Sequence, residues 1–172
     1  RAPNYIRNHD TILFYTKSDE FVFNKIYLPH PPGYRRRDGK PPQSPGMPME
    51  DTWNCQEGDR LDSIQIKSFS KEKTGFPTQK GEHLLKRVIE VSSNPGDLVL
   101  DCFAGSGTTA ATAHKLGRRW IAVECNPTTC DIACRRLRDV VAGDDPRGIT
   151  ADLDWTGGGG FRVMRTEFCA QS

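Results

Sequence analysis

The chain has 172 residues, enough for one domain with a buried core, and a formal net charge of +2. So small a charge gives no argument for nucleic-acid binding, which would have to come from a local basic patch. No apolar run approaches the ~20 residues of a membrane span, and no segment resembles a signal peptide. Because the first residue is Arg1 rather than Met, we expect a fragment or a processed chain.

The first predicted element is a buried strand over residues 9–18, where residues 12–15 form an apolar run between polar ends. Residues 25–48 are rich in proline and hold a cluster of basic side chains around a single acid, Asp38. We predict an irregular basic loop there, either functional or disordered.

An amphipathic helix is predicted over residues 82–93, with four apolar side chains on one face: Leu84, Leu85, Val88 and Ile89. A turn over residues 94–97 leads into a strand, Leu98 to Leu100, that ends on Asp101. A glycine turn follows, then a small-residue helix from Thr108 to Leu116, closed by Gly117.

A second strand, Trp120 to Val123, ends on Glu124. The next helix starts after Asn126, with Pro127 suited to its first position. Its predicted inward-facing residues are Ala133, Leu137, Val140 and Val141. Residues 143–160 read as a loop, and residues 161–164 as a short final strand.

The six cysteines include no C-x-x-C pair. Cys130 and Cys134 lie four residues apart on a predicted helix, shortly after Cys125. A zinc site is conceivable but lacks the usual ligand pairs. We therefore expect no metal, and instead buried, reduced thiols in a cytoplasmic protein.

Asp101 and Glu124, at the ends of two neighbouring predicted strands, are the strongest functional signal. Two carboxylates there suit a ligand with a cationic amino-acid end and a ribose, as in S-adenosylmethionine. Residues 105–110 also fit G-x-G-x-x-[GA], so a dinucleotide site is an alternative. A carboxylate directly before the turn would repel phosphate but attract an ammonium group, which favours S-adenosylmethionine. A tight turn that needs glycine only for its geometry is the third interpretation.

Three segments closely resemble the amino-methylating DNA methyltransferases, namely residues 76–80 (FPTQK), 93–97 (SNPGD) and 101–109 (DCFAGSGTT). These enzymes transfer a methyl group from S-adenosylmethionine to N6 of adenine or N4 of cytosine. The T-x-K segment precedes the glycine motif here, as in the circularly ordered group whose catalytic half lies upstream. The resemblance implies an α/β, Rossmann-like methyltransferase fold, here with an incomplete sheet.

The resemblance is closest over residues 64–141. Residues 7–17 resemble the family's late strand, and residues 157–164 its glycine-rich tail strand. The family usually has proline where Gly81 and Cys102 stand, but neither change removes a ligand group.

The resemblance also implies a set of cofactor-binding residues. Asp101 and the glycine turn would line the methionine end, Glu124 would hold the ribose hydroxyls, and the T-x-K segment would lie near the cofactor carboxylate. The full set is Thr78, Lys80, Asp101, Phe103, Ala104, Gly105, Ser106, Gly107, Thr108 and Glu124.

The family's catalytic tetrapeptide, an acid or amide followed by two prolines and an aromatic residue, is not recognisable. In the family it accepts hydrogens from the target amine and stacks on the flipped base. The nearest candidate, residues 30–34 (HPPGY), has histidine in place of the acceptor and a glycine before the aromatic. We expect the motif upstream of Arg1, so the isolated chain should be poorly soluble and inactive.

We thus predict three parts. Residues 1–24 end the catalytic half, residues 25–63 form the basic loop as a target-recognition region, and residues 64–172 bind S-adenosylmethionine. The predicted contacts to double-stranded DNA are Tyr34, Arg35, Arg36, Arg37 and Lys40. A solvated charge run explains these residues equally well.

The implied activity is site-specific methylation of adenine N6, with cytosine N4 as the second choice. A restriction subunit or a second copy of the chain would be further partners, and no membrane is involved. Two other functions remain open: an NAD-type oxidoreductase fragment, and a non-catalytic methyltransferase remnant that binds nucleic acid.

Overall fold

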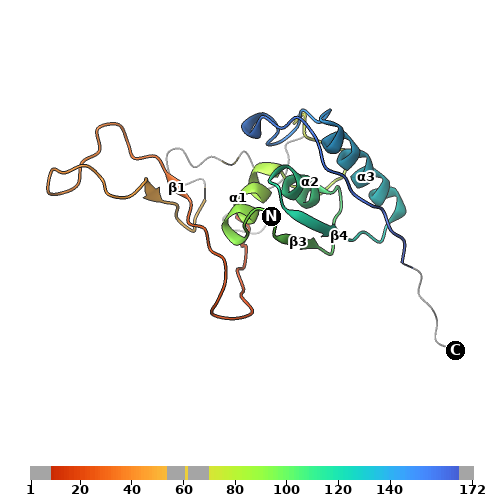
Figure 1. Ribbon diagram of the computed structural model, residues 1–172, viewed down its shortest axis with the longest axis horizontal. Helices are drawn as coiled ribbons and strands as arrows, with labels where there is room; N and C mark the ends of the chain where they lie inside the picture. The colour runs from red at the N-terminus through yellow and green to blue at the C-terminus, as the bar shows by residue number, and fades with distance from the viewer. Residues whose placement is uncertain (1–8, 54–60, 62–69, 167–172) are drawn as a thin grey trace, which may run out of the picture.

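The computed structural model describes residues 9–53, 61 and 70–166. An α/β body holds three helices, α1 (Glu82–Ser92), α2 (Thr108–Lys115) and α3 (Pro127–Ala142), with a sheet of β3 (Leu98–Asp101) and β4 (Arg119–Ala122). A 3-10 turn, η1 (Ala151–Leu153), follows α3. Strands β1 (Tyr27–Leu28) and β2 (Met47–Pro48) lie outside this body, at the base of a long loop (Figure 1).

The predicted strand–turn–helix–strand unit is confirmed. β3 and β4 run parallel, with Val99 opposite Trp120 and Leu100 opposite Ile121. Helix α2 connects the strands and packs against both, and also against α1 and α3. Its small residues allow this close approach, since Ala110 and Ala111 are buried in one core cluster with residues of α3. The unit therefore sets the carboxyl ends of both strands at one edge of the sheet.

Helix α1 confirms the predicted amphipathic helix. Leu84 and Ile89 are buried. Gly81 at the N-cap offers no side-chain hydrogen bond, and the Glu72 carboxylate instead accepts from the N–H of Glu82 at 2.8 Å. At the other end, the amide of Asn24 donates to the carbonyl of Glu90 at 2.9 Å. Both ends of α1 are thus satisfied by residues distant in sequence.

Helix α3 begins and ends as its sequence indicates. The side chain of Asn126 accepts from the N–H of Thr129 at 3.2 Å, and Pro127 occupies the first turn. Gly143 closes the helix with a φ of 81°, a left-handed conformation that favours glycine. The predicted inward-facing residues Ala133, Leu137 and Val140 are buried, and Val141 is half-buried.

One face of the β3/β4 pair packs against the helices, while the other is exposed. We call this second surface the open sheet face; its residues are Leu98, Leu100, Ile121 and Val123, which are 53%, 60%, 49% and 50% exposed. Trp120 and Ala122 point the opposite way and pack against the core of α2 and α3. The sheet is therefore covered on one side only by the described residues.

The buried strand predicted over residues 9–18 is wrong. This segment is irregular and exposed, with Leu13 at 68% and Tyr15 at 83%. No strand of the described residues pairs with it, and apolar side chains need a facing layer before they can be buried. Phe14 packs only on Phe21 and Phe23, with ring centroids 5.8 and 5.6 Å apart. The preceding Arg7 and Asn8 lie outside the described residues.

The strand predicted over residues 161–164 is also not formed. The segment is irregular, and Met164 is 84% exposed. It is held instead by a ring contact, because Phe161 packs on Trp120 with centroids 5.8 Å apart. The glycines just before it make an extended ladder entropically costly, and none of the described strands lies beside it.

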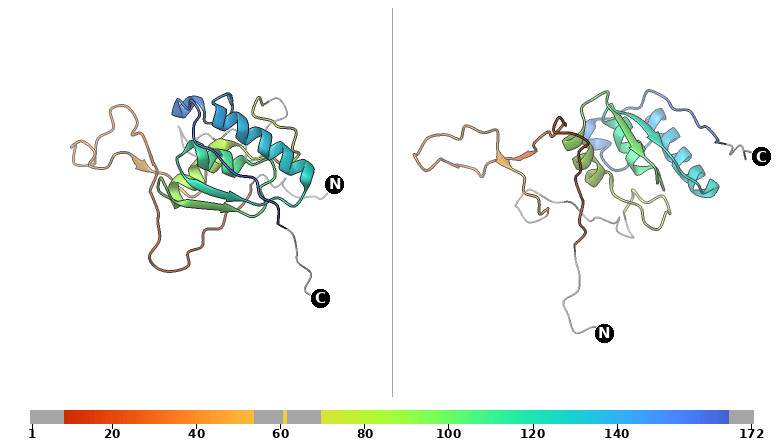
Figure 2. Two further views of the ribbon diagram at one scale, coloured as in Figure 1. Left: turned by 45° about the vertical axis from the view of Figure 1, so that its right-hand side comes forward. Right: turned by 90° about the horizontal axis from the view of Figure 1, so that it is seen from below.

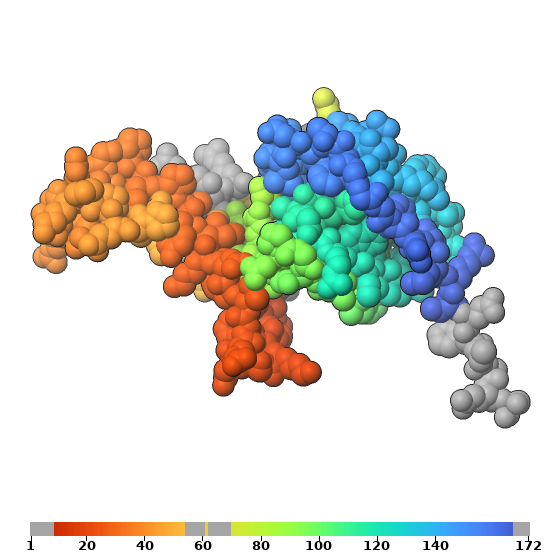
Figure 3. Space-filling model, viewed as in Figure 1, coloured from red at the N-terminus to blue at the C-terminus, as the bar shows by residue number. Residues whose placement is uncertain are grey.

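The loop between β1 and β2 confirms the irregular basic segment and adds a short closure. The two strands pair antiparallel, with Tyr27 opposite Pro48 and Leu28 opposite Met47. A Cβ on Gly46 would lie 2.1 Å from the carbonyl oxygen of Leu28, so the closure requires glycine at that position. Both views in Figure 2 and the space-filling view in Figure 3 show the loop projecting away from the α/β body.

Candidate functional site

The glycine turn lies between the end of β3 and the start of α2. Gly105 and Gly107 have φ values of 53° and 74°, in the left-handed region that strains other residues. Both also pack tightly. A Cβ on Gly105 would lie 3.0 Å from the ring of Phe76, and one on Gly107 would lie 3.1 Å from the Cβ of Ala133. The turn therefore needs glycine for its conformation and for the close approach of its neighbours.

Glu124 closes the turn from the tip of β4. Its carboxylate accepts from the N–H of Gly105 and from the N–H of Asn126, each at 2.9 Å. The hydrogen bond from Asn126 is the main reason that the pKa of Glu124 lies below its ordinary value, and the bond from Gly105 adds to it. The side chain is therefore anionic at neutral pH and keeps acceptor positions for a further donor.

Asp101 lies at the tip of β3. One carboxylate oxygen accepts from the N–H of Phe103 at 3.0 Å, which starts the turn. The other oxygen forms no hydrogen bond within the described part of the chain. The neighbouring ring of Phe103 is 92% exposed. An acid with one oxygen left unbonded by the described residues and an exposed apolar ring thus lie two positions apart in the sequence at this edge.

Backbone hydrogen bonds tie the two strand tips together. The N–H of Val123 donates to the carbonyl of Asp101 at 2.8 Å, and the N–H of Ala104 donates to the carbonyl of Val123 at 2.9 Å. The structure therefore brings the predicted residues 101–108 and Glu124 to one edge of the sheet. The residues of the turn itself are buried there, namely Ala104, Gly105, Ser106, Gly107 and Thr108.

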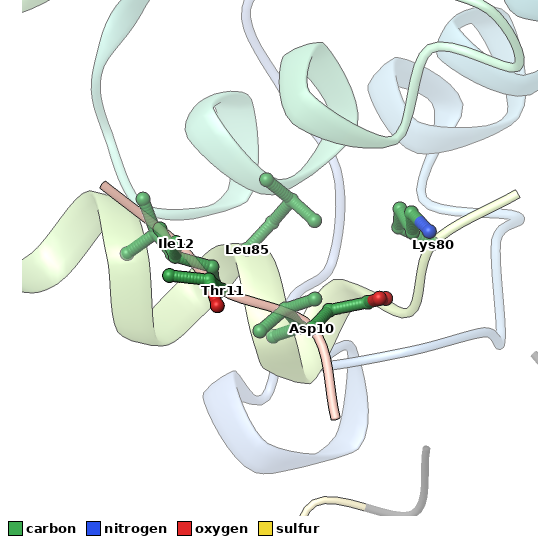
Figure 4. Close-up of a pocket in the computed structure, with 7 residues that line it drawn as sticks. Asp10, Thr11, Ile12, Lys80 and Leu85 are labelled. Atoms are coloured by element: carbon green, nitrogen blue, oxygen red, sulfur yellow. The ribbon is translucent and has the colours of Figure 1, made fainter. Parts of the chain in front are cut away.

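The T-x-K segment lies beside this turn. The carbonyl of Lys80 accepts from the hydroxyl of Thr108 at 3.3 Å, whereas Thr78 is exposed two residues earlier. The ammonium of Lys80 forms no salt bridge with any described residue. Lys80 and Asp10 both line a groove of about 420 Å³ whose floor is the apolar face of α1 (Figure 4).

The predicted DNA-binding residues lie together in the β1/β2 loop, away from the glycine turn (Figure 1). Tyr34 stacks on His30 with centroids 4.6 Å apart and ring planes at 3°. Arg36 pairs with Asp38 at 3.4 Å. Arg35, Arg37 and Lys40 are exposed. The loop thus presents one ordered aromatic ring beside several exposed cations.

A buried ion network behind the site was missed by sequence reasoning. The Glu82 carboxylate accepts from Lys115 at 2.9 Å and from Arg136 at 2.8 Å, and Lys115 also reaches Asp145 at 2.7 Å. We call these residues, with Glu72 and Arg147, the buried ion network. The positions of Glu82 and Arg136 in the sequence could have indicated this network, because both lie on the inward faces of amphipathic helices.

Two carboxyl groups of the network, Glu72 and Asp145, have pKa values shifted in opposite directions. Burial raises the pKa of Glu72 above its ordinary value and outweighs the N–H of Glu82. Burial acts the same way on Asp145, but hydrogen bonds from Lys115 and Arg147 outweigh it and hold that pKa low. The guanidinium of Arg147 correspondingly has a raised pKa, since its bond to Asp145 overcomes the effect of burial.

No group of three or more metal-ligating side chains gathers anywhere in the described residues. Cys130 and Cys134 come within 3.9 Å on α3 and are half-buried, while Cys102 and Cys125 are exposed. Burial raises the pKa of Cys134, and its hydrogen bond with Cys130 adds to the rise. The other two cysteines, Cys55 and Cys169, lie outside the described residues. None of the described helices is long and apolar enough to cross a membrane.

The fold is α/β, and its glycine turn and the two strand-tip acids, Asp101 and Glu124, lie at one edge of the parallel sheet. Residues 1–135 match a family model for DNA methylases of the N6/N4 type. The chain belongs to this family of DNA methyltransferases.

Individual relatives agree with the family. The chain is 38% identical over 136 residues to the DNA adenine methyltransferase YhdJ of Escherichia coli K12, covering 79% of this chain and 41% of that protein. It is 35% identical over 130 residues to the type II methyltransferase M1.MboII of Moraxella bovis, covering 68% of this chain and 49% of the relative. The chain thus spans less than half the length of these two relatives.

A solved structure, the M1.HpyAVI–SAM complex, is 30% identical with a TM-score of 0.44, covering 69% of this chain and 44% of that chain. The matching family model and the two relatives are DNA methylases, not NAD-dependent oxidoreductases.

Proposed function

We propose that this chain is the S-adenosylmethionine-binding part of a DNA amino-methyltransferase, which methylates adenine N6 or, as second choice, cytosine N4. The observation that carries the proposal is the glycine turn held between Asp101 and Glu124 at one edge of a parallel sheet, in a chain of the N6/N4 methylase family. Bound S-adenosylmethionine would supply an activated methyl group.

The residues of this edge fit the chemical groups of that cofactor. Asp101 uses one carboxylate oxygen in the turn, which leaves the other to attract an ammonium group. Glu124 remains charged and can accept from ribose hydroxyls while it holds Gly105. Lys80, with no ionic partner in the described residues, supplies a cation for the cofactor carboxylate. Lys80 and Asp101 would thus orient the amino-acid end from its two sides.

Calorimetric titration with S-adenosylmethionine tests the proposal. Asp101→Asn keeps the oxygen that accepts from Phe103 but removes the charge, so it should weaken binding by ~1.5–3 kcal/mol, the range for hydrogen bonds to charged groups. Glu124→Gln should weaken it similarly through the ribose. The matched control is Asp131→Asn, at an exposed acid on α3. Tight binding of NAD with no response to the methyl donor would overturn the assignment.

We further propose that the β1/β2 loop contacts double-stranded DNA. Arg35, Arg37 and Lys40 are exposed cations that could neutralise phosphates. His30 covers one face of Tyr34, so the ring is held in place with its other face available for stacking. Phosphate contacts of this kind would position the duplex, whereas the sequence would be read through contacts with the base edges.

The transfer reaction needs a second set of residues. The family's catalytic tetrapeptide is not recognisable in the sequence, and residues 30–34 depart from it in having histidine in place of the acceptor and a glycine before the aromatic residue. We propose that this motif belongs to a longer form of the protein. A restriction subunit or a second copy of the chain would be its further partners.

A further inference from the structure

The hydroxyl of Thr108 joins three segments that lie far apart in sequence. Thr108 is the first residue of α2 and is 5% exposed. Its hydroxyl donates to the carbonyl of Lys80 at 3.3 Å, accepts from Nη1 of Arg136 at 2.9 Å, and lies 3.2 Å from the hydroxyl of Ser106 in the same turn. A hydroxyl has one proton to donate and can still accept, so both bonds are satisfied together. The Thr108 side chain is therefore engaged by protein groups on two sides.

Arg136 is fixed in turn by the acids of the buried ion network. It is 2% exposed, and its Nη2 donates to Glu82 at 2.8 Å and to Glu72 at 3.3 Å. Glu72 also accepts from the N–H of Glu82 at the start of α1. A planar guanidinium whose Nη2 is held by two carboxylates presents its Nη1 in a fixed direction. That direction is toward Thr108 and the glycine turn.

These contacts set the position of Lys80 relative to Asp101. Lys80 reaches the glycine turn through its own carbonyl, by way of Thr108. Asp101 is fixed to the same turn through the N–H of Phe103. A ligand carrying a carboxylate and an ammonium on one carbon must meet both side chains at a set separation.

We propose that Arg136 is a positioning residue that acts through the hydroxyl of Thr108. It holds the T-x-K segment against the glycine turn, so that Lys80 and Asp101 together grip the amino-acid end of S-adenosylmethionine. This inference rests on the proposed function. Arg136 itself is too deeply buried to touch the ligand.

A purely structural role for Arg136 would have a different signature. If the Arg136 side chain served only to neutralise Glu82, removing the Thr108 hydroxyl would not selectively weaken binding of the amino-acid end of S-adenosylmethionine. Thr108→Val tests this, because it keeps the size and branching of the side chain and leaves the pair of Arg136 with Glu82 intact. Thr108→Ser keeps the hydroxyl and is the matched control.

Two ligands separate positioning from general damage. S-adenosylmethionine carries the amino-acid end, whereas 5′-methylthioadenosine has the same adenosine and thioether without it. In calorimetric titrations of the 172-residue chain, Thr108→Val should lower the affinity for S-adenosylmethionine about tenfold, which corresponds to the loss of one hydrogen bond. The affinity for 5′-methylthioadenosine should not change. Thr108→Ser should bind both ligands like the wild type. Thermal unfolding checks that each variant is folded, and Thr108→Ala replaces the valine variant if that one is not.

Lys80 supplies the second arm of the experiment. Lys80→Met should also lower the affinity for S-adenosylmethionine alone. Adding Thr108→Val to Lys80→Met should cause no further loss of affinity, because the hydroxyl acts through Lys80. If the wild type binds S-adenosylmethionine, the inference would be overturned by Thr108→Val lowering the affinity for both ligands equally, or by its lowering neither. A wild-type chain that bound neither ligand would overturn the proposed function, and this inference with it.

Discussion

Glu82, Lys115 and Arg136 show at the residue scale what a hydrophobic pattern conceals. All three are essentially buried, yet each occupies a helix whose apolar residues define its face. A buried charge is tolerated only when it is paired and hydrogen-bonded. Here the Glu82 carboxylate also accepts from the N–H of Ile149 at 3.1 Å, which draws the segment after α3 onto α1.

Removing one member of the network should destabilise the fold strongly. Lys115→Met leaves Glu82 and Asp145 without their shared cation, and breaking a buried pair in this way costs ~3–5 kcal/mol. Urea unfolding at pH 7 measures the loss. At that pH the contribution of Asp145 to stability is fully present, because the pKa of its carboxyl group is lower in the folded protein than the ordinary value of 3.8. This contribution is complete above that ordinary value and is lost as the pH falls through the pKa of the folded state.

Lys73→Met is the matched control, since Lys73 is exposed and forms no salt bridge with the described residues. It should change the free energy of unfolding by less than ~0.5 kcal/mol, as is usual for surface substitutions. Equal effects of the two lysine substitutions would mean that the network contributes nothing to stability.

At the scale of elements, the β3–α2–β4 unit could be predicted because its signals are local. Alternating strand residues, turn glycines and a small-residue helix follow one another directly between residues 97 and 124. Asn126 and Gly143 likewise mark the ends of α3 within the sequence itself. The presence of both acids at one edge follows from this order, since parallel strands end on the same side.

The strands predicted over residues 9–18 and 161–164 failed for the opposite reason. A strand is stabilised by a neighbour that its own sequence does not specify, and neither segment has one among the described residues. The same limit applies to the buried ion network, whose partners come from five separate segments. The local sequence pattern predicted where Asp101 and Glu124 lie, but it did not predict the contacts that support Lys80.

The β1/β2 loop makes a prediction of its own, tested in the longer enzyme. Replacing Arg35, Arg36 and Arg37 together with alanine should lower DNA affinity and flatten its dependence on salt by up to ~3 counterions. Binding measured over a series of salt concentrations gives the slope. Replacing the exposed Arg135 and Arg138 of α3 controls for the loss of charge alone. A slope unaltered by the loop variant would leave the loop as a solvated tether.

At the scale of the whole molecule, the proposed function assigns to the described residues one side of a reaction. They would supply groups for a methyl donor, but the sequence lacks the tetrapeptide that in the family would hold the acceptor amine. The open sheet face also leaves Leu100 and Ile121 more than 45% exposed, in a protein that spans less than half the length of two relatives. A larger assembly or a longer chain would cover such a surface.

The 172-residue chain should therefore bind S-adenosylmethionine without methylating DNA, whereas a form extended upstream should do both. Binding the donor without positioning the amine leaves the barrier to transfer almost unchanged. A radiolabel-transfer assay on both proteins tests this. Turnover by the shorter chain would show that its acceptor residues have been missed, and Pro31 and Pro32 would be the first place to look.

The buried ion network also bears on how the molecule folds. Its charges come from the segment at Glu72, from α1, α2 and α3, and from the segment at Asp145, so they are all compensated only when these five segments have assembled. A half-formed body would carry unpaired charge in a dry interior, which raises the free energy of every partly folded species. The network thus favours all-or-none unfolding, and a ligand that binds at the glycine turn would stabilise the body as one cooperative unit.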